Sequence, residues 1–137
     1  MNAAAARAVL LVGAVYVVVG ILFGELAGGA ASLRSRVAWR WAAWVVSAIA
    51  FGAHIAYEQV RLRRSPRATA FHAASAAALG AFGLAVAANV HAYLASAREH
   101  ARALALSLVI WPVMTALPAF VVAFATATLL ARARRRP

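Results

Sequence analysis

Four long apolar runs, separated by short breaks that carry arginine, constrain this chain more than any other feature of its sequence. The runs cover residues 8–27, 37–62, 68–96 and 103–131 of a chain of 137 residues. A helix needs about 20 mainly apolar residues to cross the hydrocarbon core of a bilayer, and each run reaches that length. The sequence therefore predicts an all-α membrane protein whose single domain, residues 1–137, consists of four transmembrane helices.

The composition excludes the other broad classes of protein. Hydrophobic residues make up 66% of the chain and charged residues 12%, whereas a soluble domain carries about 25% charged residues. Cysteine is absent, which excludes disulfides, thiolate metal sites and thiol nucleophiles. A soluble globular fold is therefore excluded, and any chemistry takes place in or beside the bilayer.

The breaks between the runs are short, at residues 28–36, 61–67 and 97–102. Short connections make consecutive helices antiparallel neighbours, so we expect an up-down-up-down bundle. A cleaved signal peptide is the alternative for the first run, with Arg7 as its basic region and Gly29-Ala30-Ala31 as a cleavage site. We expect a permanent helix there, since the run is long enough to span.

All 14 cations are arginine, and they give a net charge of +11. Their position at the ends of apolar runs is typical of anchoring at lipid headgroups, so no nucleic-acid partner is implied. The N-terminus, the second break and the C-terminal tail hold nine of them, and the opposite side holds five (Arg34, Arg36, Arg40, Arg98 and Arg102). This bias predicts both termini in the cytoplasm, and the arginine and alanine usage indicates a bacterial inner membrane. The candidate contacts to anionic headgroups are Arg61, Arg63, Arg64, Arg67, Arg132, Arg134, Arg135 and Arg136.

Small residues predict where the helices pack. Gly13, Gly20 and Gly24 share one face of the first run with Tyr16 and Gly28, and Gly20-x-x-x-Gly24 permits close approach of another helix. Packing within the bundle and dimerisation are both compatible with this pattern. The third run is so rich in alanine that we expect it to be the central helix.

Polar residues inside the runs are candidates for function, because an ionisable side chain at mid-bilayer costs about 2.5–3.5 kcal/mol on insertion scales. One face of the second run carries a polar stripe of Arg40, Trp44, Ser47, Phe51, His54, Glu58 and Arg61. His54 and Glu58 lie a few residues before the second break, and His72 lies a similar number of residues after it. The three side chains are therefore expected at similar depths in the membrane. We therefore expect His54, Glu58 and His72 to form a cluster.

Four interpretations of this cluster remain open. A proton or cation relay uses histidine beside a carboxylate. A b-type haem uses His54 and His72 as axial ligands. A divalent metal site uses all three side chains and leaves an open position. In the structural interpretation, His54 and Glu58 form a hydrogen-bonded pair, with Glu58 neutralised by Arg61 or Arg64.

A second set of polar residues is expected at the outer face, and comprises Glu25, Asn89 and His91. Glu25 is expected to pair with an arginine, and His91 to line a vestibule or act as an outer ligand, with His100 nearby in the third break. Pro112 and Pro118 are expected to kink the fourth helix.

The functional prediction is a small polytopic membrane protein without enzymatic activity, because no catalytic constellation or nucleotide-binding loop is present. We expect it to act as an oligomer or as an accessory subunit of a larger membrane complex, with ion, proton or small-solute passage along the His54 and Glu58 face. The alternative is an electron-transfer subunit that binds haem b.

Overall fold

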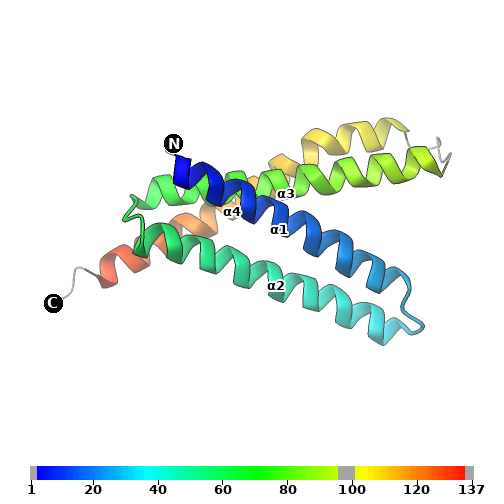
Figure 1. Ribbon diagram of the computed structural model, residues 1–137, viewed down its shortest axis with the longest axis horizontal. Helices are drawn as coiled ribbons and strands as arrows, with labels where there is room; N and C mark the ends of the chain where they lie inside the picture. Colours follow the sequence, from blue (N-terminus) through cyan, green and yellow to red (C-terminus); the bar gives the residue numbers. More distant parts are fainter. Residues whose placement is uncertain (1–2, 96–100, 135–137) are drawn as a thin grey trace.

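The computed structural model describes residues 3–95 and 101–134. This part of the chain is all-helical, with four α-helices that correspond to the four apolar runs (Figure 1). The helices are α1 (Ala3–Gly28), α2 (Leu33–Val60), α3 (Pro66–Leu94) and α4 (Ala101–Ala133). The predicted helical class is therefore confirmed for the described residues.

Serine residues start α2 and α3. The hydroxyl of Ser32 accepts a hydrogen bond from the backbone N–H of Ser35 at 3.1 Å, and the Ser35 side chain bonds back to the Ser32 backbone in a capping box. The hydroxyl of Ser65 accepts a hydrogen bond from the backbone N–H of Ala68 at 3.3 Å at the start of α3, and Pro66 follows it in the first helical turn. Proline fits there because the first turn of a helix has no partner for its N–H groups.

A tight turn joins α2 to α3. Arg63 has a left-handed backbone with φ of 48°, and the N–H of the next residue, Arg64, donates to the carbonyl of Glu58 at 3.1 Å. The chain therefore folds back onto the last turn of α2. As a consequence, the start of α3 faces the end of α2.

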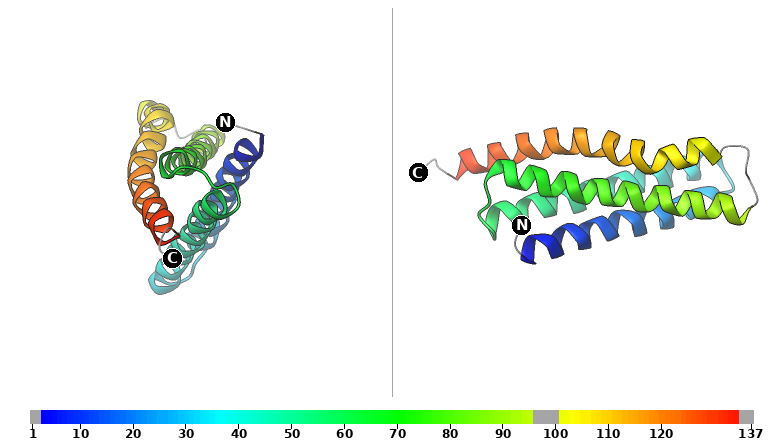
Figure 2. Two further views of the ribbon diagram at one scale, coloured as in Figure 1. Left: turned by 90° about the vertical axis from the view of Figure 1, so that its left-hand side faces the viewer. Right: turned by 90° about the horizontal axis from the view of Figure 1, so that it is seen from above.

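The two ends of the molecule differ in the helix connections and chain termini that lie there (Figure 2). Both the described chain termini and the α2–α3 connection lie at one end, which we call the α2–α3 end (Figures 1 and 2). The α1–α2 connection lies at the other end, which we call the α1–α2 end. Here the hairpin of α1 and α2 diverges from α3 and α4, whereas the four helices converge at the α2–α3 end (Figure 1).

Helix α3 is the central helix, as its alanine content predicts. It packs extensively against α4 and α1, and less extensively against α2, while α1 has no comparable contact with α4. Ten of its residues are buried, and most of them are alanine or glycine. Small side chains let neighbouring backbones approach closely, which is the way helices pack inside a bilayer.

The glycine stripe of α1 divides between two environments. A Cβ at Gly13 would lie 3.1 Å from the Cβ of Leu79 in α3, and one at Gly20 would lie 2.6 Å from Leu84. A Cβ at Gly24 or at Gly28 would meet nothing within 4 Å. The first half of the stripe therefore packs within the bundle, and the second half is open.

The surface of the molecule is strongly apolar. The buried hydrophobic residues are mostly alanines, while large side chains such as Leu11, Trp44 and Val121 are about two-thirds exposed or more. A soluble monomer rarely exposes apolar surface this extensively, because water solvates it poorly. Three helices, α1, α3 and α4, are long and apolar enough to cross a membrane.

Helix α2 is not among these candidate spans. Its arginines, together with His54, Glu58 and Gln59, lower its hydropathy, although its 28 residues exceed the length that a span needs. The predicted span over residues 37–62 therefore stays a prediction.

Helix α4 continues through both of its prolines, Pro112 and Pro118. Only Ala123 and Ala127 are buried along it, and they pack with Ile55, Ala70 and Ala73 in an apolar core near the α2–α3 end. Other residues of α4 are partly buried, such as Phe120 against this core, and the large apolar side chains on its opposite side are exposed. Most of the outer surface of this helix is thus available to lipid or to a protein partner.

Candidate functional site

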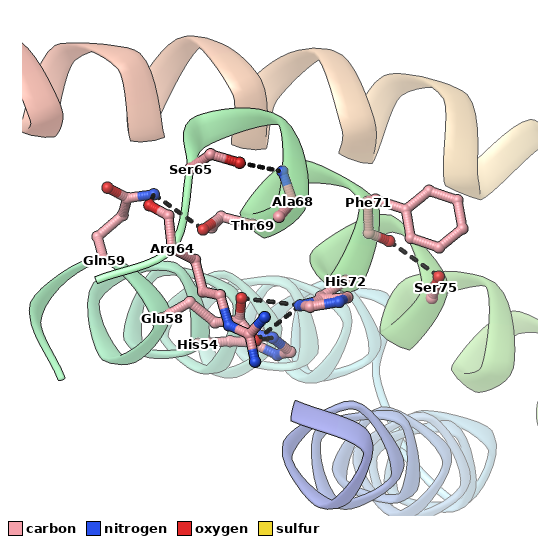
Figure 3. Close-up of polar contacts among 10 residues, drawn as sticks. All are labelled: His54, Glu58, Gln59, Arg64, Ser65, Ala68, Thr69, Phe71, His72 and Ser75. Carbon is pink, nitrogen blue, oxygen red and sulfur yellow. Dashed lines mark hydrogen bonds and ion pairs between the residues drawn. The ribbon is translucent and has the colours of Figure 1, made fainter. Parts of the chain in front are cut away.

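The predicted cluster of His54, Glu58 and His72 forms at the α2–α3 end. Two of its members come from the last turns of α2 and one from the second turn of α3 (Figure 3). The exposed fraction is 3% for His54, 0% for Glu58 and 6% for His72. These side chains are therefore withdrawn from the surroundings of the protein.

Glu58 is the centre of the cluster. The Nδ1 atom of His72 lies 2.9 Å from one carboxylate oxygen and 2.8 Å from the other, within hydrogen-bond distance of both. The Nε2 atom of His54 lies 3.8 Å from Oε1 of Glu58, which is close enough for electrostatic attraction but too far for a hydrogen bond. The carboxylate thus connects the two imidazoles and binds one of them directly.

This geometry changes the structural interpretation of the cluster. In that interpretation the hydrogen bond joins His54 to Glu58 within α2, but His72 of α3 forms it instead. Among the described residues, Arg61 and Arg64 form no ion pair with Glu58, whose ionic partners are the two histidines. The physical reason is the turn at Arg63, which brings His72 directly opposite the carboxylate.

His54 has no hydrogen-bond partner for either ring nitrogen, although both are buried. A buried polar group without a partner is costly, and such groups in a native structure often mark a site of function. One ring nitrogen of a neutral imidazole carries a proton and the other accepts one. His54 is therefore an unoccupied donor and acceptor beside a carboxylate.

The carboxyl group of Glu58 and Nδ1 of His72 are within hydrogen-bond distance, so a proton between them can lie on either group. The pair is neutral overall when His72 is an imidazolium beside an ionised carboxylate, and also when Glu58 is protonated beside a neutral imidazole. The two forms differ only in where the proton lies, which is the property that a proton carrier needs.

Apolar residues surround the cluster. Ile55 lies between His54 and Glu58 in α2, and Ala70 and Ala73 flank His72 in α3; all three belong to the core that α4 completes. The ring of Phe71 approaches that of His72 edge-on, with 6.4 Å between the ring centroids. This packing lowers the local dielectric, which strengthens the interactions within the cluster.

A polar clamp that the sequence interpretation missed lies beside the cluster. The Nε2 group of Gln59, which is 2% exposed, donates to Oγ1 of Thr69 at 2.8 Å and to the carbonyl of Arg64 at 3.1 Å (Figure 3). The guanidinium of Arg134 donates to the carbonyl of Gln59 and so ties the end of α4 to α2. The sequence did carry a signal for this contact. Gln59 directly follows Glu58, and Thr69 lies at the same depth on the other side of the turn.

The arrangement does not fit the haem or the metal interpretation. A haem between His54 and His72 needs a slot between the imidazoles, but the carboxylate of Glu58 connects them and would have to leave. In the part of the chain that the structure describes, no three histidine, aspartate or glutamate side chains are arranged to hold a metal ion.

The outer-face candidates do not come together as a site. Asn89 is occupied, because its amide donates to the carbonyls of Ala85 and Leu104 at 2.8 and 2.9 Å and so joins α3 to α4. Glu25 and His91 are exposed, and Glu25 forms no ion pair with a described arginine. His100 and Arg98 lie outside the described residues.

The arginines expected at lipid headgroups gather at the α2–α3 end. Arg64 is partly buried, while the exposed members of this set are Arg61, Arg63, Arg67, Arg132 and Arg134. Arg135 and Arg136 lie outside the described residues. The exposed charge at this end is therefore basic.

The fold and the candidate site together define a class, a small helical protein with three candidate membrane spans and a buried histidine–carboxylate cluster. These spans indicate an integral membrane protein. Comparison of the chain with protein families, with characterised proteins and with solved structures gives no match.

Proposed function

We propose that the protein is a four-span integral membrane protein of a bacterial cytoplasmic membrane that carries protons through His54, Glu58 and His72. The single observation that supports the proton relay is a fully buried carboxylate that binds one imidazole and lies 3.8 Å from a second imidazole without partners. An ionisable cluster of this kind is rare in a membrane segment, since burial of each charge is costly.

In the proposed topology, all four helices cross the bilayer in alternating directions, including α2. The position of both described termini at the α2–α3 end supports an even number of crossings. The larger number of arginines at that end supports its placement in the cytoplasm. The proton-carrying cluster then lies in the cytoplasmic leaflet.

Impermeant thiol labelling tests this topology, because the chain has no cysteine of its own. In intact cells we expect labelling of Ala31→Cys, next to the α1–α2 connection, but not of Arg67→Cys or Ala133→Cys. All three positions are exposed in the structure. Labelling of Ala31→Cys and Arg67→Cys from the same side contradicts a crossing by α2.

The relay moves a proton in two steps. The proton shared by Glu58 and His72 passes from the carboxylate to the free ring nitrogen of His54, after a small side-chain movement shortens their 3.8 Å separation. His54 then releases a proton from its other ring nitrogen, Nδ1, and a proton that arrives at His72 restores the neutral pair. Each imidazole can accept a proton on one nitrogen while the other releases one, so transfer leaves no lasting charge.

Proton flux in liposomes tests the relay. We expect flux into vesicles that contain the purified chain under an imposed potential, measured with an internal pH-sensitive dye, and its fall in Glu58→Gln to the level of empty vesicles. Glu25→Gln is the matched control, because it makes the same chemical change at an exposed carboxylate. His54→Gln is the second variant, since it keeps the bond between Glu58 and His72.

Three outcomes contradict the relay. The first is wild-type flux no greater than that of empty vesicles. The second is unchanged flux in Glu58→Gln. The third is unchanged flux in His54→Gln, provided that circular dichroism shows the variant to be folded. A Soret band in the purified protein, lost in His54→Ala and in His72→Ala, would instead support electron transfer by haem.

An oligomeric or accessory role is part of the same proposal. Helix α4 supports it, because apolar side chains such as Val109, Met114 and Val121 leave about half or more of their surface uncovered. We expect light scattering of the detergent-solubilised protein to give a mass of more than one chain, or co-purification with other membrane subunits. A lone monomer in both measurements contradicts this part.

A further inference from the structure

A groove between α1 and α2 lies at the α1–α2 end, remote from the proton-carrying cluster. Its volume is about 530 Å³. The residues that line it and carry the argument are Gly20, Gly24 and Gly28 of α1 and Arg36, Arg40 and Trp44 of α2. A second hollow of about 440 Å³ continues from it along Arg40 and Trp44.

Each of the two walls of the groove is a row of residues along one helix. On each helix the lining residues recur at intervals of three and four positions, so each row follows a single helix face. The row of α2 begins with two guanidinium groups near the α1–α2 connection and ends with an indole further along the helix. The groove therefore has a charged mouth and an apolar interior.

No residue that the structure describes neutralises either arginine. Among the described residues, Arg36 and Arg40 form no ion pair, and the nearby carboxylate of Glu25 pairs with neither of them. Both side chains are exposed. Two cations on one helix face beside a hollow form a site of positive potential that attracts an anion.

The glycines leave the floor of the groove open. A side-chain atom added at Gly24 or at Gly28 would meet nothing within 4 Å, and Phe23 lies beside them against Trp39, with ring centroids 6.0 Å apart. The floor is thus apolar, and it is open at Gly24 and Gly28. An occupant with an apolar chain fits such a surface, and a small inorganic anion does not use it.

A second copy of the chain fits the groove less well than a lipid. A symmetric dimer places the same surface of both copies in contact, so Arg36 and Arg40 of one copy would approach those of the other. Like charges at an interface repel and disfavour association. The occupant that complements both the charge and the apolar floor is an anionic amphiphile.

We propose that this groove binds an anionic phospholipid, with its phosphate between Arg36 and Arg40 and an acyl chain along Gly24 and Trp44. The site is independent of the proton relay, because it shares no residue with it. The site also differs from the general contact that exposed arginines make with lipid headgroups, since its apolar floor selects a lipid.

Native mass spectrometry of the full chain in detergent tests this site. Titration with phosphatidylglycerol and with phosphatidylcholine gives an apparent Kd for each lipid, and we expect tighter binding of phosphatidylglycerol. The double variant Arg36→Gln/Arg40→Gln should weaken phosphatidylglycerol binding about 25-fold, because each arginine near an anionic lipid contributes roughly five-fold. Arg61→Gln/Arg67→Gln is the matched control, with the same loss of charge at exposed positions of the other end.

Gly24→Leu tests the apolar part without a change of charge. The open space around Gly24 accommodates the new side chain, which then fills the floor of the groove. We expect phosphatidylglycerol binding to fall at least ten-fold, with unchanged helix content by circular dichroism.

Several results would overturn the proposal. Equal affinity for the two lipids would do so, as would an equal loss in the control variant, since either result indicates contact by surface charge alone. Unchanged binding in Gly24→Leu would show that no acyl chain occupies the floor. Displacement of the lipid by inorganic phosphate would indicate a simple anion site.

Discussion

The two ends of the molecule differ in the burial and the ion pairing of Glu58 at one end and of Arg36 and Arg40 at the other. At the α2–α3 end, Glu58 is fully buried and its partners are histidines of the same chain. At the α1–α2 end, Arg36 and Arg40 are exposed beside an open groove, and no described residue forms an ion pair with them. The difference indicates that the buried carboxylate at the first end is used within the protein, whereas the two arginines beside the groove are available to something outside it.

Packing follows the same division. At the α2–α3 end, side chains of α2, α3 and α4 meet in one core around Ile55. At the other end, a Cβ atom added at Gly24 or at Gly28 would meet nothing within 4 Å. Substitutions at matched positions in the two ends therefore give the sharpest tests of the comparison.

The largest effect is expected from loss of a carboxylate. Glu58→Ala leaves two buried imidazoles without their partner, and we expect it to lower the free energy of unfolding by about 3–5 kcal/mol. Glu25→Ala removes an exposed carboxylate, so it should change this free energy by about 0.5 kcal/mol or less. Reversible unfolding in mixed micelles measures both, and equal effects of the two variants would remove the contrast between the ends.

An intermediate effect is expected from an added methyl group. A Cβ at Gly80 of α3 would lie 2.5 Å from the Cβ of Tyr16, which is too close without a movement of the helix. Gly80→Ala should therefore cost about 1–3 kcal/mol through overpacking.

Gly24→Ala is the matched control for Gly80→Ala, because its new methyl group enters open space. We expect it to have no destabilising effect, since alanine is the better helix former. The same unfolding measurement compares the two variants. A destabilising Gly24→Ala would mean that the groove is closed by contacts within the protein.

The smallest effect is expected in the polar clamp. Thr69→Val removes the hydroxyl that accepts from Gln59 at 2.8 Å, while the carbonyl of Arg64 still accepts from the same amide. Hydrogen bonds between membrane helices contribute about 0.6 kcal/mol on average, so a loss of about 0.5–1.5 kcal/mol is expected.

Thr126→Val is the control for the clamp, because the hydroxyl of Thr126 bonds only the carbonyl of Val122 in its own helix and is exposed. Its unfolding free energy should match that of the wild type. A loss in Thr126→Val as large as that in Thr69→Val would assign the effect to local helix stability.

The cluster of His54, Glu58 and His72 was predictable because helix geometry fixes depth. The short break around Ser65 places residues before and after it at similar heights, which is enough to bring one histidine of α3 near the end of α2. The identity of the hydrogen bond was not predictable. It depends on the left-handed Arg63 and on the rotation of α3 about its axis, neither of which leaves a periodic pattern in the sequence.

The sequence by itself determined that the described chain is helical, because runs of apolar residues of this length fold as helices and satisfy their own backbone hydrogen bonds. It also determined that α3, with its small side chains, lies in the centre. Tertiary structure alone decided that His72 binds Glu58, that both nitrogens of His54 are free, and that Gly13 and Gly20 pack while Gly24 lines a groove. The reason is that spacing fixes which residues share a helix face, whereas the crossing of α1, α2 and α3 decides which parts of that face meet another helix.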